Sequence, residues 1–193
     1  MDNIEEEIKK HYDQIGWKIE EGTTKDTRSN EDLRNVAQDY LIKCAQRILR
    51  RIPDQGDNIL DMGSGPIPHD SYLLFSKNFS KRYCVDISKV ALEAAKKKIG
   101  NHGVFLHGSF SDIPLEKDFF DCSISLHVIY HIEKNKQEEA VRKLIHVTKP
   151  GHPVIIIYSN PNSITKLQIF KITKNVLKKT FFKKRKQGPV IYA

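Results

Sequence analysis

A pair of closely spaced glycines follows an acidic residue in the segment Asp61-Met62-Gly63-Ser64-Gly65-Pro66. Glycine lets a backbone turn sharply and come close to a ligand, so this segment predicts a binding turn after a strand. The alternative is a dinucleotide turn, whose G-x-G-x-x-G pattern places a pyrophosphate at the start of a helix. Here Pro68 stands where the third glycine would be, and the Asp61 carboxylate would repel a pyrophosphate. The turn therefore favours a cationic ligand, such as one that carries an ammonium group.

A second acid, Asp86, ends the next apolar run, Tyr83-Cys84-Val85-Asp86. In nucleoside-binding parallel sheets, an acid at the end of the second strand accepts hydrogen bonds from the ribose hydroxyls. The order of strand, glycine turn, helix and strand-terminal acid therefore has the spacing of an adenosine site.

Strands and helices alternate along the part of the chain that carries these residues. Strands are predicted over 58–62, 82–85, 104–107, 121–126 and 154–159, and helices over 70–77, 88–99 and 136–148. Ser88 is the expected N-cap of the second of these helices, and Gly100 follows its end. Strands separated by helices imply right-handed crossovers, so we predict an α/β fold of three layers, with a mostly parallel sheet between helices.

We divide the chain into three parts. Residues 1–52 form an N-terminal helical cap, with helices over 4–15 and 29–51, the second of which begins at a capping box of Ser29 and Asp32. Residues 53–160 form the ligand-binding core. Residues 161–193 form a basic amphipathic helix and an incomplete C-terminal part of the same domain.

Several segments, in order, resemble class I S-adenosylmethionine-dependent methyltransferases. They are residues 59–66, 85–88, 107–115, 120–132 and 149–154. The resemblance implies a Rossmann-like core, S-adenosylmethionine as cofactor with S-adenosylhomocysteine as product, and in-line methyl transfer to a small-molecule or lipid-like acceptor. Because sheets of this family usually have seven strands and only five are found here, we expect a longer parent protein.

The resemblance also implies roles for individual residues. Gly63, Ser64 and Gly65 would pass under the methionine and ribose, Asp61 would orient the amino-acid part, and Asp86 would bind the ribose. Ile87 would pack on the adenine, and Leu126 and His127 would lie beside the sulfonium. Ser109 stands where the family carries an acid facing the adenine amino group, which leaves a backbone contact from Phe110.

Catalysis of methyl transfer requires chiefly that the nucleophile be held close to the methyl group, and a general base helps a hydroxyl acceptor. His131 and His127 are the candidate bases, with pocket lining as the alternative. Their spacing also suits two metal ligands on a helix, but it straddles a strand exit, so we predict no metal. Candidate substrate or cap residues are Tyr12, Trp17, Arg34 and Tyr40. Burial alone equally explains Tyr12 and Trp17, and a solvated charge explains Arg34.

The charge of the chain is concentrated near its C-terminus. Nine of the 32 Lys and Arg residues lie in 166–186 without an acidic residue, which leaves 23 basic against 24 acidic residues elsewhere. Segment 163–186 is predicted to pack an apolar stripe on the sheet; the alternatives are weak contact with an anionic membrane, an acidic acceptor or RNA. The three cysteines are far apart in the sequence, which indicates a reducing, cytoplasmic location.

These features leave two other functions open. A fold relative that binds the cofactor or a partner without catalysis is one, and an RNA-directed methyltransferase that uses the basic segment is the other. An NAD-linked enzyme is disfavoured by Asp61 and Pro68.

Overall fold

The structure is a computed structural model of the whole chain, and it describes residues 4–16, 19–20, 23–24 and 35–158. The predicted cap residues Trp17 and Arg34, the Ser29 capping box and the basic segment 163–186 lie outside the described residues.

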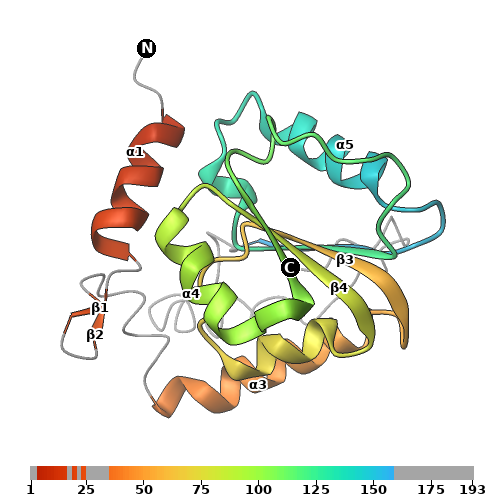
Figure 1. Cartoon of the computed structure of the whole chain (residues 1–193), viewed down its shortest axis with the longest axis horizontal. Helices are drawn as coiled ribbons and strands as arrows, with labels where there is room; N and C mark the ends of the chain where they lie inside the picture. The colour runs from red at the N-terminus through yellow and green to blue at the C-terminus, as the bar shows by residue number, and fades with distance from the viewer. Residues whose placement is uncertain (1–3, 17–18, 21–22, 25–34, 159–193) are drawn as a thin grey trace, which may run out of the picture.

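A five-stranded parallel sheet forms the centre of the molecule, which confirms the predicted fold class (Figure 1). Its order is β5-β4-β3-β6-β7. The strands are β3 (Gly56–Met62), β4 (Phe79–Asp86), β5 (Gly103–His107), β6 (Cys122–Leu126) and β7 (Val154–Ile157). Strand order reverses between β3 and β6, so the carboxyl ends of these strands and of β4 border the position where ligands bind in open α/β sheets.

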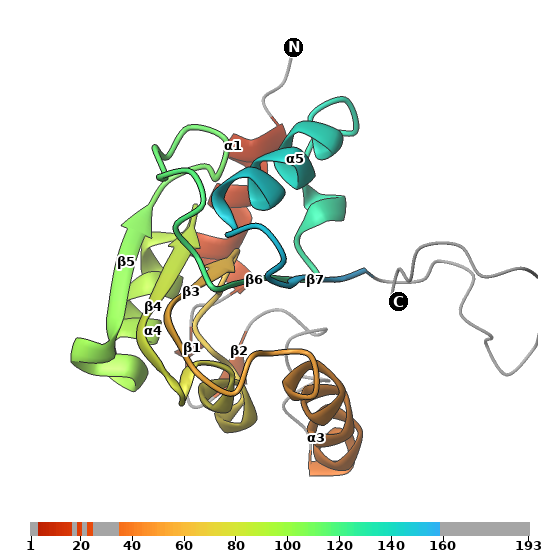
Figure 2. The same cartoon turned by 90° about the vertical axis from the view of Figure 1, so that its right-hand side faces the viewer.

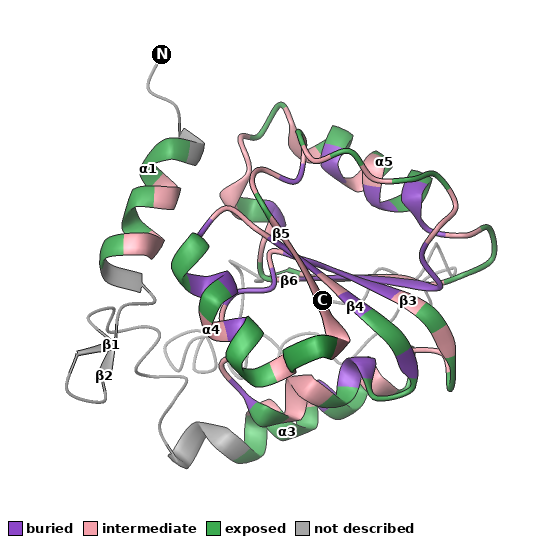
Figure 3. Ribbon diagram, viewed as in Figure 1, coloured by how far each residue is buried: buried purple, intermediate pink, exposed green. Residues whose placement is uncertain are grey.

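Helices cover both faces of the sheet, as predicted. The helix α5 (Gln137–Val147) lies on one face, and α3 (Asn35–Leu49) and α4 (Lys89–Ile99) lie on the other (Figures 1 and 2). Two apolar clusters correspond to the two faces. One joins α5 to alternate residues of β3 such as Leu60 and Met62, and the other joins α3 to Ile59 and to Ile124 of β6. The strands are accordingly buried between exposed helix surfaces (Figure 3).

Local sequence explains the ends of α4. The Ser88 hydroxyl accepts a hydrogen bond from the Ala91 N–H at 3.1 Å, which confirms Ser88 as the N-cap. Gly100 ends the helix with a φ of 62°, a left-handed conformation that glycine adopts without strain.

The segment after the glycine turn differs from its prediction. Residues 70–77 were expected to form an α-helix, but Asp70–Ser76 forms the 3₁₀ helix η2. Side chains three residues apart eclipse in a 3₁₀ helix, and the rings of Tyr72 and Phe75 are stacked with centroids 5.1 Å apart. Burial of Phe75 against the sheet favours this tighter winding.

The N-terminal region contains α1 (Ile4–His11), the π-helical turn η1 (Tyr12–Gly16) and a two-stranded antiparallel ladder of β1 (Ile19–Glu20) and β2 (Thr23–Thr24). The sequence analysis missed this ladder, because two-residue strands carry no alternating apolar pattern. The remaining short elements are the 3₁₀ turns η3 (Gly100–His102) and η4 (Ile129–His131). No helix among the described residues is both long and apolar enough to cross a bilayer.

Candidate functional site

The glycine turn leaves the central strand β3 in a conformation that depends on its glycines. Gly63 and Gly65 have φ values of 68° and 58°, in the left-handed region. A Cβ added to Gly63 would lie 2.3 Å from a methyl carbon of Val128, so the side chain that follows β6 rests directly on this glycine. The turn is therefore closely packed against the residue that follows β6, and a larger side chain at Gly63 would push the turn and Val128 apart.

Ile67 extends the same pattern. Its φ is 55°, which is strained for a β-branched residue, and its side chain is fully buried. The Lys98 ammonium, from α4, donates a hydrogen bond to the Ile67 carbonyl at 2.8 Å. Pro66 and Pro68 flank Ile67 and restrict the backbone further. The turn is thus held rigidly before any ligand arrives.

Asp86 lies at the end of β4, beside the glycine turn. Its two carboxylate oxygens each accept one backbone hydrogen bond, from Gly65 N–H and from Ser88 N–H, both at 2.8 Å. Burial raises the pKa of Asp86, the two hydrogen bonds oppose that shift, and the nearby Asp61 and Asp13 carboxylates add to it. A carboxylate has about four acceptor positions, so Asp86 can still accept two donors, such as adjacent ribose hydroxyls.

Asp61 is in a different environment. It forms a buried ion pair with Arg82 of β4, whose Nε and Nη2 both donate to the same carboxylate oxygen. The other terminal nitrogen of Arg82 donates to the Tyr72 carbonyl at 2.6 Å, and Arg82 itself has no exposed surface. The negative charge that was expected to select a cationic ligand is therefore compensated within the fold. The predicted contact of Asp61 with the cofactor stays a prediction.

Sequence analysis missed Arg82, although a signal for it exists. In the sheet, Ile59 pairs with Arg82 and Asp61 with Cys84, so Asp61 and Arg82 are diagonal neighbours on one face. A buried charge needs a partner, and an arginine within a central strand predicts one on the neighbouring strand.

The N-terminal segment reaches the same edge of the sheet. Asp13 accepts a hydrogen bond from the Ser88 hydroxyl at 2.6 Å, and Ser88 stands two residues after Asp86. Tyr12 Oη lies 3.3 Å from Nε2 of His131, in η4. Adjacent residues of η1 therefore contact the exits of β4 and β6, on either side of the glycine turn.

His131 and His127 follow β6. Burial lowers the pKa of His131, and the neighbouring His11 and His127 lower it further, so the imidazole is neutral at pH 7. Its backbone N–H donates to the Val128 carbonyl at 2.8 Å, which ties it to the residue packed on Gly63. His127 is exposed and has a φ of 61°. Residues with strained backbone conformations of this kind are concentrated at active sites and ligand-binding sites.

The turn after β5 carries the predicted adenine contacts. Phe110 is buried in the core cluster together with Met62 and Val85, so its ring packs inside the fold and only its backbone remains for a ligand. The Ser109 carbonyl accepts hydrogen bonds from the N–H groups of Asp112 and Ile113, which closes the turn.

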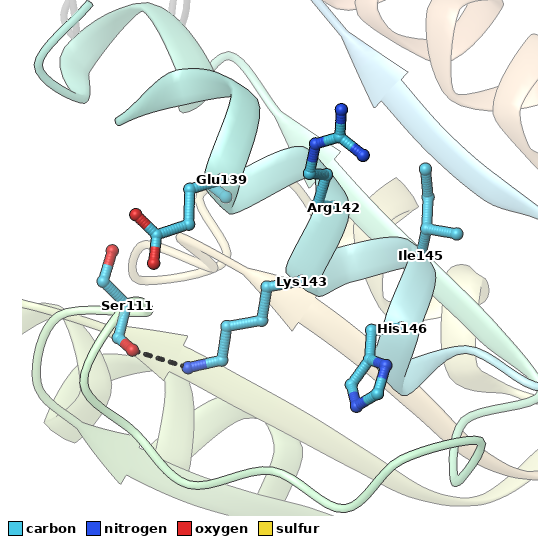
Figure 4. Close-up of a pocket in the computed structure, with 7 residues that line it drawn as sticks. Ser111, Glu139, Arg142, Lys143, Ile145 and His146 are labelled. Atoms are coloured by element: carbon cyan, nitrogen blue, oxygen red, sulfur yellow. Dashed lines mark hydrogen bonds between the residues drawn. The ribbon is translucent and has the colours of Figure 1, made fainter. Parts of the chain in front are cut away.

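Lys143, which sequence analysis did not identify, lies behind this turn. Its ammonium donates to the carbonyls of Phe110, Ser111 and Ile113 at 2.6, 2.7 and 2.8 Å. It also lines an open surface pocket of about 570 Å³ between α5 and Ser111 (Figure 4). No residue of the glycine turn lines this pocket, so it is separate from the candidate site.

The other predicted site residues lie in different places. Ile87 is partly buried, and its carbonyl lies 3.1 Å from Nε2 of His107. Leu126 ends β6 and is partly buried. Tyr40, on α3, is 67% exposed, so any part in a cap stays a prediction. Among the described residues, no group of three or more metal-binding side chains is arranged around a common centre.

Comparison with known proteins identifies the class that this fold and site define. The family described as "Methyltransferase domain" matches residues 60–156, from the buried core of β3 to β7. The chain belongs to this family. That membership confirms the resemblance to class I S-adenosylmethionine-dependent methyltransferases, and S-adenosylmethionine is the cofactor of that class.

One curated relative is the uncharacterized methyltransferase YdaC of Bacillus subtilis, which is 28% identical over 98 residues. That match covers 50% of this chain and 53% of YdaC, so the chain spans about half the length of this relative.

Solved structures share the fold. Magnesium protoporphyrin IX methyltransferase from Synechocystis, with bound S-adenosylmethionine, superposes with a TM-score of 0.63 at 16% identity, over 90% of this chain and 85% of its own. Phosphoethanolamine N-methyltransferase 1 of Haemonchus contortus superposes with a TM-score of 0.64 at 12% identity, over 82% of this chain and 32% of its own.

Proposed function

We propose that this domain transfers a methyl group from S-adenosylmethionine to a small-molecule or lipid-like acceptor. The observation that carries the proposal is the environment of Asp86. Its carboxylate is desolvated, accepts hydrogen bonds from the neutral Gly65 and Ser88 N–H groups and, among the described residues, from no cationic side chain, and it borders the glycine turn. A desolvated acid with free acceptor positions is suited to a ligand that donates hydrogen bonds, as the two ribose hydroxyls do.

When bound, the cofactor supplies an activated methyl group on its sulfonium. Asp86 would hold the ribose, and the backbone of Gly63, Ser64 and Gly65 would lie under the methionine and ribose. Ile87 would pack against the adenine, whose edge would meet the backbone of the turn that starts at Ser109. Leu126 and His127, at the exit of β6, would border the sulfonium end. Asp61 would support the glycine turn through its ion pair with Arg82.

We assign the role of general base to His131. It is neutral at pH 7 because burial and two neighbouring histidines lower its pKa, and its Nε2 is within hydrogen-bond reach of Tyr12 Oη. A neutral imidazole can take the proton of a hydroxyl acceptor as its oxygen attacks the methyl group and the sulfonium sulfur leaves as a thioether. Tyr12 would orient the ring and cover the acceptor. The two solved relatives act on a porphyrin and on phosphoethanolamine, according to their names, and both of these are small molecules.

Thermal unfolding in the presence of S-adenosylhomocysteine tests the cofactor. The midpoint temperature should rise with ligand concentration, because a ligand that binds only the folded state stabilises it by mass action. The rise should require about 10- to 100-fold more ligand in Asp86→Asn and be kept in Asp70→Asn, which changes an exposed carboxylate. An unchanged midpoint at millimolar ligand would refute the proposal.

The base is tested by the pH dependence of methyl transfer to a small-molecule extract, with labelled cofactor. For the parent protein, kcat should rise with pH through a value below the ordinary 6.5 of histidine and then level off, because only neutral His131 accepts a proton. His131→Gln should remove this limb and lower kcat by about a hundredfold or more. The matched control His146→Gln, an exposed histidine of α5, should change neither. Retention of the limb in His131→Gln would exclude His131 as the base.

A further inference from the structure

We propose that Lys143 is a positioning residue: it sets the turn formed by residues 109–113 and, through this turn, the affinity of the site for adenine. This inference rests on the proposed function, because it concerns the adenine end of the same cofactor site. Lys143 lies on α5, 30 to 33 residues after the carbonyls that it binds. Its ammonium approaches them from the side of α5 (Figure 4).

All three donors of the ammonium are used by this turn. The bonds to the carbonyls of Phe110, Ser111 and Ile113 are 2.6, 2.7 and 2.8 Å long, and the ammonium lies 5.1 Å from the centre of the Phe110 ring. A lysine has three donors, so this set is complete. Charge-assisted hydrogen bonds are stronger than neutral ones, so together they fix the direction of three carbonyl groups within one turn.

The position of Lys143 is costly for a lysine, which indicates a specific role. Burial lowers its pKa, although Asp112 and Glu139 favour the charged form. The neighbouring Arg142, by contrast, forms an exposed ion pair with Glu138 of the same helix. An exposed lysine keeps its ammonium in water, whereas the partly buried ammonium of Lys143 gives up water for three carbonyls, so its position is tied to this turn.

The turn is fixed at two further points, and both lead to the cofactor site. The Gly108 N–H donates to the Asp86 carbonyl at 3.0 Å, so the turn begins beside the proposed ribose-binding acid. The Phe110 ring is buried beneath the end of β3, with Met62. With its ring in the core and its carbonyl bound by Lys143, Phe110 can offer adenine its backbone N–H, which is a donor suited to ring nitrogen N1. Lys143 therefore acts on adenine by fixing the direction of this backbone donor.

The test compares two ligands and three variants by isothermal titration calorimetry. The ligands are S-adenosylhomocysteine and its 1-deaza analogue, in which ring nitrogen N1 of adenine is replaced by C–H. Lys143→Met keeps the apolar stem but removes the ammonium, and Lys143→Gln keeps two donors without charge. Arg142→Met is the matched control on the same helix.

For Lys143→Met we expect a loss of affinity of about tenfold for S-adenosylhomocysteine and of less than threefold for the 1-deaza analogue, because the analogue has no N1 to accept the backbone hydrogen bond. Such unequal losses measure coupling between Lys143 and N1, which general destabilisation would not produce. Lys143→Gln should fall between the parent and Lys143→Met, and Arg142→Met should bind both ligands as the parent does.

Equal losses for the two ligands, or no loss, would overturn the role of Lys143 while leaving the proposed function intact. If the parent protein binds neither ligand, the proposed function fails and this inference fails with it. Should Lys143→Met not fold, as judged by circular dichroism, Lys143→Gln carries the same comparison, and equal losses in that variant overturn the inference.

Discussion

Asp61 and Asp86 end neighbouring central strands of one sheet, yet their surroundings are opposite. Asp61 receives two hydrogen bonds from the guanidinium of Arg82, and both residues are almost completely buried. Within the described part of the chain, Asp86 receives two neutral backbone hydrogen bonds and no bond from a cationic side chain, and burial raises its pKa. The charge of Asp61 is thus balanced inside the fold, whereas that of Asp86 is not.

This difference suggests that Asp61 contributes mainly to the stability of the fold and Asp86 mainly to ligand binding. Arg82 compensates the charge of Asp61 through one carboxylate oxygen, which supports the joint between β3, β4 and η2, and the predicted cofactor contact of Asp61 would fall to the second oxygen. An uncompensated charge costs stability in the free protein and gains the most from a partner that donates hydrogen bonds. The same substitution, Asp to Asn, should therefore mainly lower the free energy of unfolding at Asp61 and mainly weaken ligand binding at Asp86.

The largest expected effect is on stability at Asp61. Asp61→Asn leaves the Arg82 guanidinium buried without a counter-charge, so the free energy of unfolding in urea should fall by about 3–5 kcal/mol. Arg82→Met should cost a similar amount, because it leaves the carboxylate unpaired. The double variant should lose less than the sum of the two, since it removes both charges. Additive losses would show that the ion pair contributes no coupling.

The next effect is on binding at Asp86. Asp86→Asn should weaken the binding of S-adenosylhomocysteine by about 10- to 100-fold, because hydrogen bonds to a charged group are each worth about 1.5–3 kcal/mol. Its free energy of unfolding should change by less than about 1 kcal/mol, since the amide removes a desolvated charge and keeps one oxygen acceptor. Calorimetry and urea denaturation of the same samples measure both quantities. A large stability loss with unchanged affinity would reverse the roles assigned to the two acids.

Much of this contrast lies beyond what the sequence alone predicts. The bend at the glycine turn, the position of Asp86 at a strand end and the Ser88 cap are confirmed, because each depends on local chemistry: a backbone that must turn, a strand that ends, a helix that starts. The ribose-binding role of Asp86 stays a prediction. Arg82 and Lys143 were missed because their roles depend on register and on contacts across 21 to 33 residues. The 3₁₀ winding of η2 was missed for the same reason, since burial of Phe75 against the sheet decides it.

The smallest effect concerns Asp13. Its carboxylate raises the pKa of Asp86, but less than burial and the Asp61 carboxylate do. A group whose pKa is raised on folding binds more protons in the folded state, so its contribution to the free energy of unfolding increases as pH falls towards the ordinary 3.8. The stability difference between the parent and Asp86→Asn should therefore differ between pH 7 and pH 4, in favour of the parent at pH 4.

Asp13→Asn removes one repulsive charge and keeps an oxygen that can accept the Ser88 hydrogen bond. When Asp13→Asn is present in both proteins, the stability difference that Asp86→Asn causes should change less with pH, by a few tenths of a kcal/mol. That is about the size of an interaction between partly exposed charges. Urea denaturation of the four proteins at both pH values measures the change. If the difference is the same with and without the Asp13 charge, the cost of Asp86 comes from burial and Asp61 alone, and the N-terminal segment contacts Ser88 without influencing the acid beside it.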